Sequence, residues 1–166
     1  MIPDLITRLD RWLMSNRPTY HQQLLPGVSS DELNRVEDRF GVQLPIAFRL
    51  LYKWRNGQSL NRSQSLEMNW QWMTLDSIVD TKIMLDSMIA SDFESPDWWR
   101  REWLPFLQNR DGDLTVIDFL GFDGGRPRQI LTFWHDESIR PVLYDSLDQW
   151  LTELIESMET DTLEVF

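Results

Sequence analysis

Apolar positions in the first part of the chain recur at helical spacing. Leu5, Leu9 and Leu13 share one stripe, so we expect a helix over residues 3–14. Pro18 limits this helix, because the residue before a proline avoids the helical conformation. The pattern therefore predicts that the chain begins with an amphipathic helix.

Two further helices are marked by residues typical of helix ends. Ser29 followed by Glu32 has the spacing of a capping box, and Gly41 is placed to end the same helix in the left-handed conformation. Pro45 suits the first turn of a third helix, where its missing N–H costs little, and the Asn-Gly pair at 56–57 terminates that helix. The residues of the third helix expected to face inward are Ala47, Leu50, Leu51 and Trp54.

The middle of the chain combines an alternating segment with a helix. Residues 66–72 alternate apolar and polar side chains, which predicts a half-buried strand. The polar segment 59–65 and the segment 91–97 are expected to be loops. Apolar spacing also predicts a helix over residues 75–90. One face of this helix carries Ile78, Lys82, Leu85 and Ile89.

The second half of the chain favours strands. Runs at 104–107, 114–119 and 128–134 predict three strands. Glycines in the segment 121–125 allow the positive φ angles that a turn between the second and third strands requires. A short fourth extended segment is expected at 140–144.

A C-terminal helix begins after Ser146, because Ser146 and Gln149 repeat the capping-box spacing. Its apolar stripe consists of Leu147, Trp150, Leu151, Leu154 and Ile155. The acidic tail, residues 159–166, is expected to fray. Helices followed by meandering strands predict an α+β fold, an antiparallel sheet with helices packed around it, formed by residues 1–166 as one domain.

Composition limits the possible functions. The hydrophobic share of 42% and the charged share of 26% are ordinary for a globular protein. The absence of cysteine excludes disulfides, thiolate zinc sites and a cysteine nucleophile, and it fits a reducing cytosol. The net charge of −11 disfavours binding to nucleic acid or anionic membranes and favours a partner with a basic surface. An alternative is that this charge only maintains solubility.

No segment indicates secretion or membrane insertion. No window approaches the roughly 20 apolar residues that span a bilayer. Asp4 stands where a signal peptide carries Lys or Arg. The sequence therefore predicts a cytoplasmic protein.

A calcium-binding loop is suggested by only part of its pattern. Asn109, Asp111 and Asp113 alternate as calcium ligands do. The sixth position of such a loop needs Gly and the twelfth needs a bidentate Glu, but these positions hold Leu114 and Leu120. A hairpin turn is therefore the preferred interpretation.

Catalytic and zinc-binding motifs are also incomplete. His135 followed by Asp136 could supply half of a catalytic triad, yet no Gly-x-Ser-x-Gly elbow occurs in the chain. His21 is far from His135 in the sequence, and two separated histidines without cysteine do not indicate a zinc site. We therefore expect no catalytic residue, no cofactor and no metal.

Several spaced motifs in the second half carry a family resemblance. They are Trp103-Leu-Pro-Phe106, Asp111-Gly-Asp113, Val116-Ile-Asp118, Gln129-Ile130, His135-Asp136 and Ser146-x-x-x-Trp150-Leu151. Their order and spacing resemble the SMI1/KNR4 superfamily, also called SUKH. The Leu-Pro-led helix that ends in Asn-Gly resembles the N-terminal half of the family, so the resemblance covers residues 29–151. It implies an α+β fold and action through binding another protein.

The resemblance also suggests particular functions. SUKH members include bacterial toxin-immunity proteins and a yeast regulator of cell-wall assembly. The first hypothesis is therefore an immunity protein that neutralises a cognate polymorphic toxin by covering its active or functional surface. A regulatory interaction module is the alternative, and a small hydrolase that uses His135 with an acid is a third hypothesis.

Candidate partner-binding residues come from two sources. The polar positions that match the family pattern are Asp111, Asp113, Asp118 and His135. Trp98 and Trp99 are further candidates, because Trp is enriched at interaction hot spots. Partner specificity is expected in residues 61–65 and 75–99, where the chain departs from the family pattern.

Overall fold

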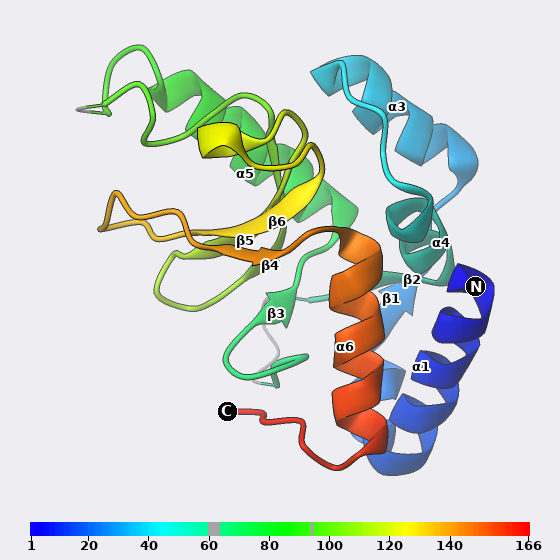
Figure 1. The fold of residues 1–166 in the computed structure, drawn as a ribbon. Helices are drawn as coiled ribbons and strands as arrows, with labels where there is room; N and C mark the ends of the chain where they lie inside the picture. The colour runs from blue at the N-terminus through cyan, green and yellow to red at the C-terminus, as the bar shows by residue number, and fades with distance from the viewer. Residues whose placement is uncertain (60–63, 94) are drawn as a thin grey trace.

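A five-stranded antiparallel sheet with the strand order β3-β4-β5-β6-β7 forms the centre of the molecule (Figure 1). The computed structural model describes residues 1–59, 64–93 and 95–166. From β4 to β7, neighbours in the sheet are also successive strands along the chain, whereas a helix separates β3 from β4. The strands are β3 (Gln71–Trp72), β4 (Trp103–Gln108), β5 (Leu114–Asp118), β6 (Gln129–Phe133) and β7 (Val142–Tyr144).

Helices cover the sheet because its central strands are buried throughout. Neighbouring residues of a strand point to opposite faces, and every residue of β5 and β6 is buried. Helix α5 (Leu75–Met88) packs against β4, and helix α6 (Leu147–Glu159) packs against β6 and β7. The Trp150 ring of α6 meets the Phe106 ring of β4 edge-on, with their centroids 5.0 Å apart.

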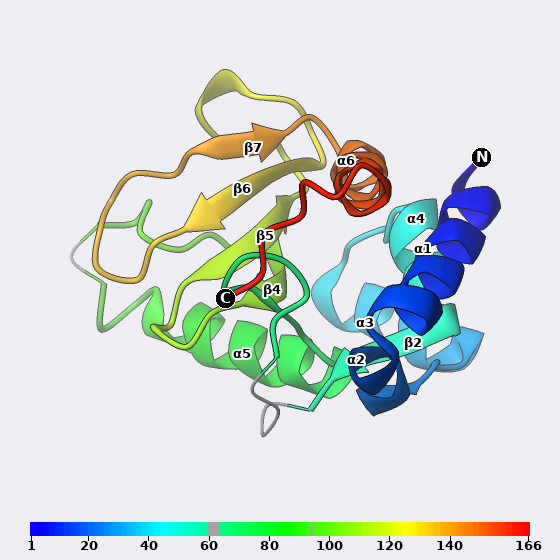
Figure 2. The same ribbon diagram turned by 90° about the horizontal axis from the view of Figure 1, so that it is seen from below.

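The N-terminal part forms a mostly helical layer beside the sheet (Figure 2). Tyr20 Oη donates to Gln58 Oε1 at 2.7 Å, and the same oxygen accepts from the backbone N of Trp72 at 3.2 Å. These bonds connect the two parts, because Trp72 belongs to β3 of the large sheet. The elements of the N-terminal part are α1 (Ile2–Asn16), α2 (Pro18–Gln23), β1 (Leu24–Pro26), α3 (Ser30–Phe40), α4 (Ile46–Trp54) and β2 (Arg55–Gln58).

The predicted α+β class is confirmed, together with most of the predicted helices and strands. The capping box at Ser29 forms, and Gly41 ends α3 with φ 64°. At the start of α6, Ser146 Oγ accepts from Gln149 N at 3.2 Å, but the Gln149 side chain accepts from Asp145 N at 2.9 Å. Only half of the second capping box is therefore present, and α6 still begins directly after Ser146.

Three expectations for the first half were wrong in detail. Helix α2 was not expected. It forms because Pro18, which limits α1, also suits the first turn of a new helix. The Asn-Gly pair at 56–57 lies within β2 and is not a helix stop. The buried residues of α4 are Ala47, Phe48, Leu51 and Tyr52, whereas Leu50 and Trp54 are only half-buried.

The segment 66–72 is a strand only at its end. Gln71 and Trp72 form β3, and a tight turn precedes them. In this turn the backbone N of Trp70 donates to Glu67 O at 2.8 Å, and Met68 has φ 45°. The alternating pattern misled the strand prediction because burial does not follow it here: the apolar Met68 is 47% exposed, whereas the polar Gln71 is buried.

The C-terminal tail is hydrogen-bonded, in contrast to the expected fraying. Met68 N donates to Glu164 O at 2.6 Å, and Phe166 N donates to Met68 O at 2.6 Å (Figure 2). At the start of the tail, Glu159 forms an ion pair with Arg8 at 2.6 Å. The tail is held in place because the backbone of Met68 offers both a donor and an acceptor to it.

Some sequence expectations concern positions that the structure leaves undescribed. Residues 60–63 of the expected loop 59–65, and residue 94 of the expected loop 91–97, lie outside the described residues. Among the helices that are described, none combines the length and the apolar character needed to cross a membrane.

Candidate partner-binding surface

The side chain of Asn109 closes the hairpin between β4 and β5. Its Oδ1 accepts from the backbone N of Asp111 at 3.0 Å and of Asp113 at 2.9 Å, and its Nδ2 donates to Asp113 Oδ2 at 2.8 Å. Gly112 adopts φ 99°, which a side chain would disfavour. These residues therefore form a hydrogen-bonded turn.

Asp113 also connects this hairpin to the end of β6. Its Oδ1 accepts from the backbone N of His135 at 3.0 Å and from His135 Nδ1 at 2.8 Å. The His135 ring lies over Gly112, where an added Cβ would be 3.7 Å from the ring. Asp113 is only 6% exposed, whereas the His135 side chain is 47% exposed. Asp113 therefore supports the surface from beneath, and His135 forms part of it.

The pKa values of both groups shift so that the charged pair is favoured. Burial raises the pKa of Asp113, but hydrogen bonds from the His135 backbone, the His135 ring and Asn109 outweigh burial and lower that pKa. The hydrogen bond to Asp113 raises the pKa of His135, and the nearby charges of Asp136 and Asp111 add to this effect. The hairpin edge therefore carries several carboxylates around one imidazole.

Asp113, His135 and Asp136 are also close enough to approach one metal ion, because their possible ligand atoms lie within 4.8 Å of one another. However, both oxygens of Asp113 already accept hydrogen bonds that hold the hairpin. A metal would have to replace those bonds. We therefore assign the three groups to hairpin structure and surface charge.

A pocket of about 410 Å³ lies between the hairpin and α5. We call it the hairpin–α5 pocket. Its walls are mainly apolar, and Asn109 and His135 contribute polar edges. Its apolar wall residues include Met84, Met88, Phe93, Trp98 and Phe133. They come from α5, the segment after it and β6, so only the folded chain brings them together.

The pocket exists because α5 carries apolar side chains beyond the face that packs on the sheet. Ile78, Lys82 and Leu85 are buried on that face. At about 100° per residue, Met84 is rotated by about 160° from Lys82, and it is 54% exposed. Met84 therefore adds exposed apolar surface to the wall of the pocket.

The two candidate tryptophans have different environments. Trp98 is half-buried and lines the pocket, and the Arg140 guanidinium lies 5.3 Å from its ring. Trp99 is 0% exposed, donates from Nε1 to Asp86 Oδ1 at 2.8 Å and packs edge-on against Trp103. The expectation that Trp99 contacts a partner is therefore wrong for this folded state, because the core encloses its side chain.

Asp118 does not join the other candidate aspartates. It is 0% exposed and accepts from the backbone N of Gly121 at 3.2 Å and from Gln129 Nε2 at 2.9 Å. It stands at the far end of β5 from Asp113, about 17 Å away for a five-residue strand. The expected acidic face of Asp111, Asp113 and Asp118 is therefore not formed: Asp118 folds the β5–β6 turn, and only Asp111 is well exposed.

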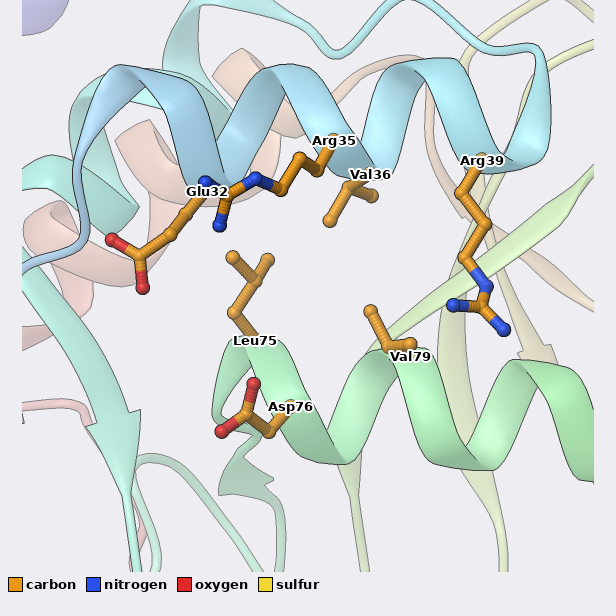
Figure 3. Close-up of a pocket in the computed structure, with 7 residues that line it drawn as sticks. All are labelled: Glu32, Arg35, Val36, Arg39, Leu75, Asp76 and Val79. Atoms are coloured by element: carbon orange, nitrogen blue, oxygen red, sulfur yellow. The ribbon is translucent and has the colours of Figure 1, made fainter.

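A second concavity of about 450 Å³ lies between α3 and α5 (Figure 3). We call it the α3–α5 groove. Val36 and Val79 face each other across it, and Arg39 projects at one end (Figure 3). Glu32 and Asp76 lie at the other end, so the lining carries both signs of charge (Figure 3). Glu32 is also committed to the capping box of α3.

The sequence prediction missed the apolar side chains that line the hairpin–α5 pocket. Met84 and Met88 lie outside the predicted inward face of their helix, and Phe93 lies in a predicted loop. The available signal was the presence of apolar residues on more than one side of α5. The expected specificity region, residues 75–99, does contain these three residues.

The fold is that of an α+β domain, with helices packed on an antiparallel sheet. Its main surface feature is the apolar pocket beside the acidic hairpin. The chain matches the SMI1 / KNR4 family (SUKH-1) over residues 27–153. Because this match covers most of the chain, the protein belongs to the SMI1/KNR4 family.

Two named proteins show more limited similarity. KNR4/SMI1 homolog 2 of Debaryomyces hansenii is 20% identical over 215 aligned positions, which cover 99% of this chain and 36% of the yeast protein. F-box protein SKIP16 of Arabidopsis thaliana is 37% identical over 59 residues, which cover 36% of this chain and 14% of the plant protein. The chain therefore spans well under half the length of either relative.

Proposed function

We propose that this protein binds another protein and acts as an immunity protein, which neutralises a cognate polymorphic toxin by covering its active or functional surface. The observation that supports this proposal is the hairpin–α5 pocket, an apolar concavity beside the carboxylates of Asp111 and Asp136. An apolar centre with a polar edge is the usual anatomy of a protein-binding surface.

The overall charge fits this proposal. At −11 the chain attracts a basic partner and speeds their encounter. Once in contact, apolar side chains that enter the pocket slow dissociation, because apolar anchors carry most of the affinity of an interface. Occlusion requires a stable complex and no chemical step, so the proposal includes no catalytic residue, and it places the protein in the cytoplasm with the toxin's target.

A regulatory interaction module is the second candidate. The similarity to KNR4/SMI1 homolog 2 extends along almost the whole chain, and both named relatives come from eukaryotes, a yeast and a plant. A regulator of this kind would use the same pocket for exchangeable partners at lower affinity. The number and stoichiometry of bound proteins distinguish the two functions.

Purification of the tagged chain from its native host tests the proposal. An immunity protein should retain one toxin at a 1:1 ratio and restore growth when the two are co-expressed. Several partners at lower ratios would support the regulatory module instead. Hydrolytic turnover by the purified chain that disappears in His135→Ala, with folding intact, would overturn both candidates in favour of an enzyme.

A further inference from the structure

The hairpin–α5 pocket is large enough to receive one large side chain of a partner. Its volume of about 410 Å³ lies at the lower end of the roughly 300–1,000 Å³ range of ligand sites. An aromatic side chain buries about 150–250 Å² when it is enclosed, which suits a concavity of this kind. The pocket can therefore receive one aromatic or long aliphatic residue of a partner.

The walls of the pocket favour an aromatic occupant. Met84 and Met88 are flexible and polarisable side chains, which adapt to an inserted ring and make favourable sulfur–aromatic contacts. Phe93 and Trp98 offer ring edges or faces to the same occupant. The exposed position of Met84 means that such an occupant would cover apolar surface that water now contacts.

The opposite wall is fixed in position. Arg140 Nη2 donates to the backbone O of Trp98 at 2.8 Å, and its guanidinium lies over the Phe133 ring at 4.6 Å. On the hairpin side, Asp113 Oδ1 accepts one hydrogen bond from the backbone N of His135 and one from the Nδ1 atom of its ring. The pocket therefore has flexible methionines on one side and a rigid polar edge on the other. A preformed wall lowers the conformational entropy that is lost on binding.

The charges at the edge specify the neighbours of the occupant. Asp111 and Asp136 are both exposed, and both are close enough to His135 to raise its pKa. A Lys or Arg beside the inserted residue would meet these carboxylates, whereas an acidic neighbour would be repelled. The charge of the whole chain acts in the same direction.

We infer that the hairpin–α5 pocket binds a segment of a partner protein in which one aromatic side chain, inserted between α5 and the hairpin, is flanked by Lys or Arg residues that pair with Asp111 and Asp136. This inference rests on the proposed function, because it names the chemistry of the partner that the function requires.

Three capped tripeptides test the inference: Lys-Trp-Lys, Glu-Trp-Glu and Lys-Ala-Lys. The protein, with its seven methionines labelled at the methyl carbon, is titrated with each peptide and followed by NMR. Lys-Trp-Lys should shift the Met84 and Met88 methyl signals and leave that of the exposed Met14 in α1 unchanged. Its Kd should be at least about fivefold lower than that of either other peptide at low salt.

Two tryptophan substitutions on α5 provide matched variants. Thr81→Trp places a ring in the pocket, because Thr81 lines it, and should raise the Kd of Lys-Trp-Lys at least about fivefold. Ser87→Trp, at an exposed position of the same helix that does not line the pocket, should leave the Kd unchanged. Denaturation of each variant confirms that it folds.

The outcomes separate this inference from the proposed function. Equal affinities for the three peptides, or shifts away from Met84 and Met88, overturn the inference. If the native partner binds Thr81→Trp as tightly as wild type, the proposed function stands and the pocket assignment fails. If Lys-Trp-Lys binds as expected and no protein is retained from the native host, the pocket chemistry stands and the immunity function fails.

Discussion

The two flanks of α5 carry concavities of similar volume and different character. On one flank, Met84 and Met88 face a hairpin fixed by hydrogen bonds around Asp113. On the other flank, Val79 faces α3 across a groove lined by both acidic and basic side chains (Figure 3). The first combines a mainly apolar lining, which includes the exposed Met84, with the carboxylates of Asp111 and Asp136 at its edge. The two concavities differ in chemistry at similar volume, so volume alone does not identify a binding site.

The difference follows from what supports each concavity. The sheet forms part of the wall of the hairpin–α5 pocket, since Leu114 and Phe133 belong to strands β5 and β6. The α3–α5 groove lies between two helices, and its apolar residues Val36 and Leu75 are buried, whereas Met84 of the hairpin–α5 pocket is 54% exposed. A partner would therefore gain less apolar contact in the groove.

The largest expected effect is a loss of stability in the core that supports both concavities. Trp150→Ala removes a ring that packs on Phe106 and donates from Nε1 to Glu67 Oε1 at 2.7 Å. Burial raises the pKa of Glu67, and loss of this donor leaves its half-buried carboxyl without that hydrogen bond. We expect a loss of about 3–5 kcal/mol in the free energy of unfolding, measured by urea denaturation. A midpoint equal to that of wild type would show that α6 contributes little to the sheet.

A second pair of variants compares the supports of the two flanks. Asp113→Ala removes the acceptor of three hydrogen bonds and should cost about 2–3 kcal/mol, because bonds to a buried charge are strong. Ser29→Ala, which removes the α3 cap beside the groove, should cost about 1 kcal/mol. Both values come from urea denaturation. Equal losses would contradict the idea that the pocket has the more rigid wall.

A smaller effect concerns the rate at which a partner binds. Asp111→Asn combined with Asp136→Asn should lower the association rate constant about two- to fivefold at 0.05 M salt, because rim charges act on encounter. The difference should shrink at 0.5 M salt, where screening is strong. Stopped-flow measurements with the purified native partner give the rates. Asp76→Asn, in the α3–α5 groove, is the control, and an equal decrease there would move the interface to the groove.

The smallest effect is the pH dependence of the Asp113–His135 pair. The raised pKa of His135 adds stability below its ordinary value of 6.5, which is lost as the pH rises through the folded-state pKa. The lowered pKa of Asp113 adds stability above its ordinary value of 3.8, which is lost as the pH falls through the folded-state pKa. The pair therefore stabilises the protein most between those two values.

His135→Gln tests this window by urea denaturation at a series of pH values. Its midpoint should fall furthest below that of wild type near pH 5–6, and the gap should narrow above neutral pH. Arg39→Gln, at the groove, is the control and should show a gap that does not change across the same range. A constant gap for His135→Gln would show that the pair does not contribute to stability.

The sequence by itself determined the features that depend on neighbouring residues. Helix α3 begins after Ser29 and ends at Gly41 as expected, because a cap is made by side chains and backbone within one turn of the helix. The strands β4 to β7 and the apolar stripe of α6 were also predicted, since runs rich in β-branched and aromatic residues favour strands and apolar residues at helical spacing favour a helix. These signals were sufficient for the α+β class.

Only the tertiary structure decided which residues meet and which are accessible. Asp111 and Asp118 both matched the family pattern, but Asp111 precedes β5, whereas Asp118 is the last residue of that strand and is buried. Trp98 lines a pocket, whereas the adjacent Trp99 lies in the core. The local signal for the pocket side chain Met84 was limited to its place outside the inward face of α5, because the hairpin and β6 walls of the pocket come from distant parts of the chain. Accessibility depends on contacts between remote segments, and local periodicity does not encode those contacts.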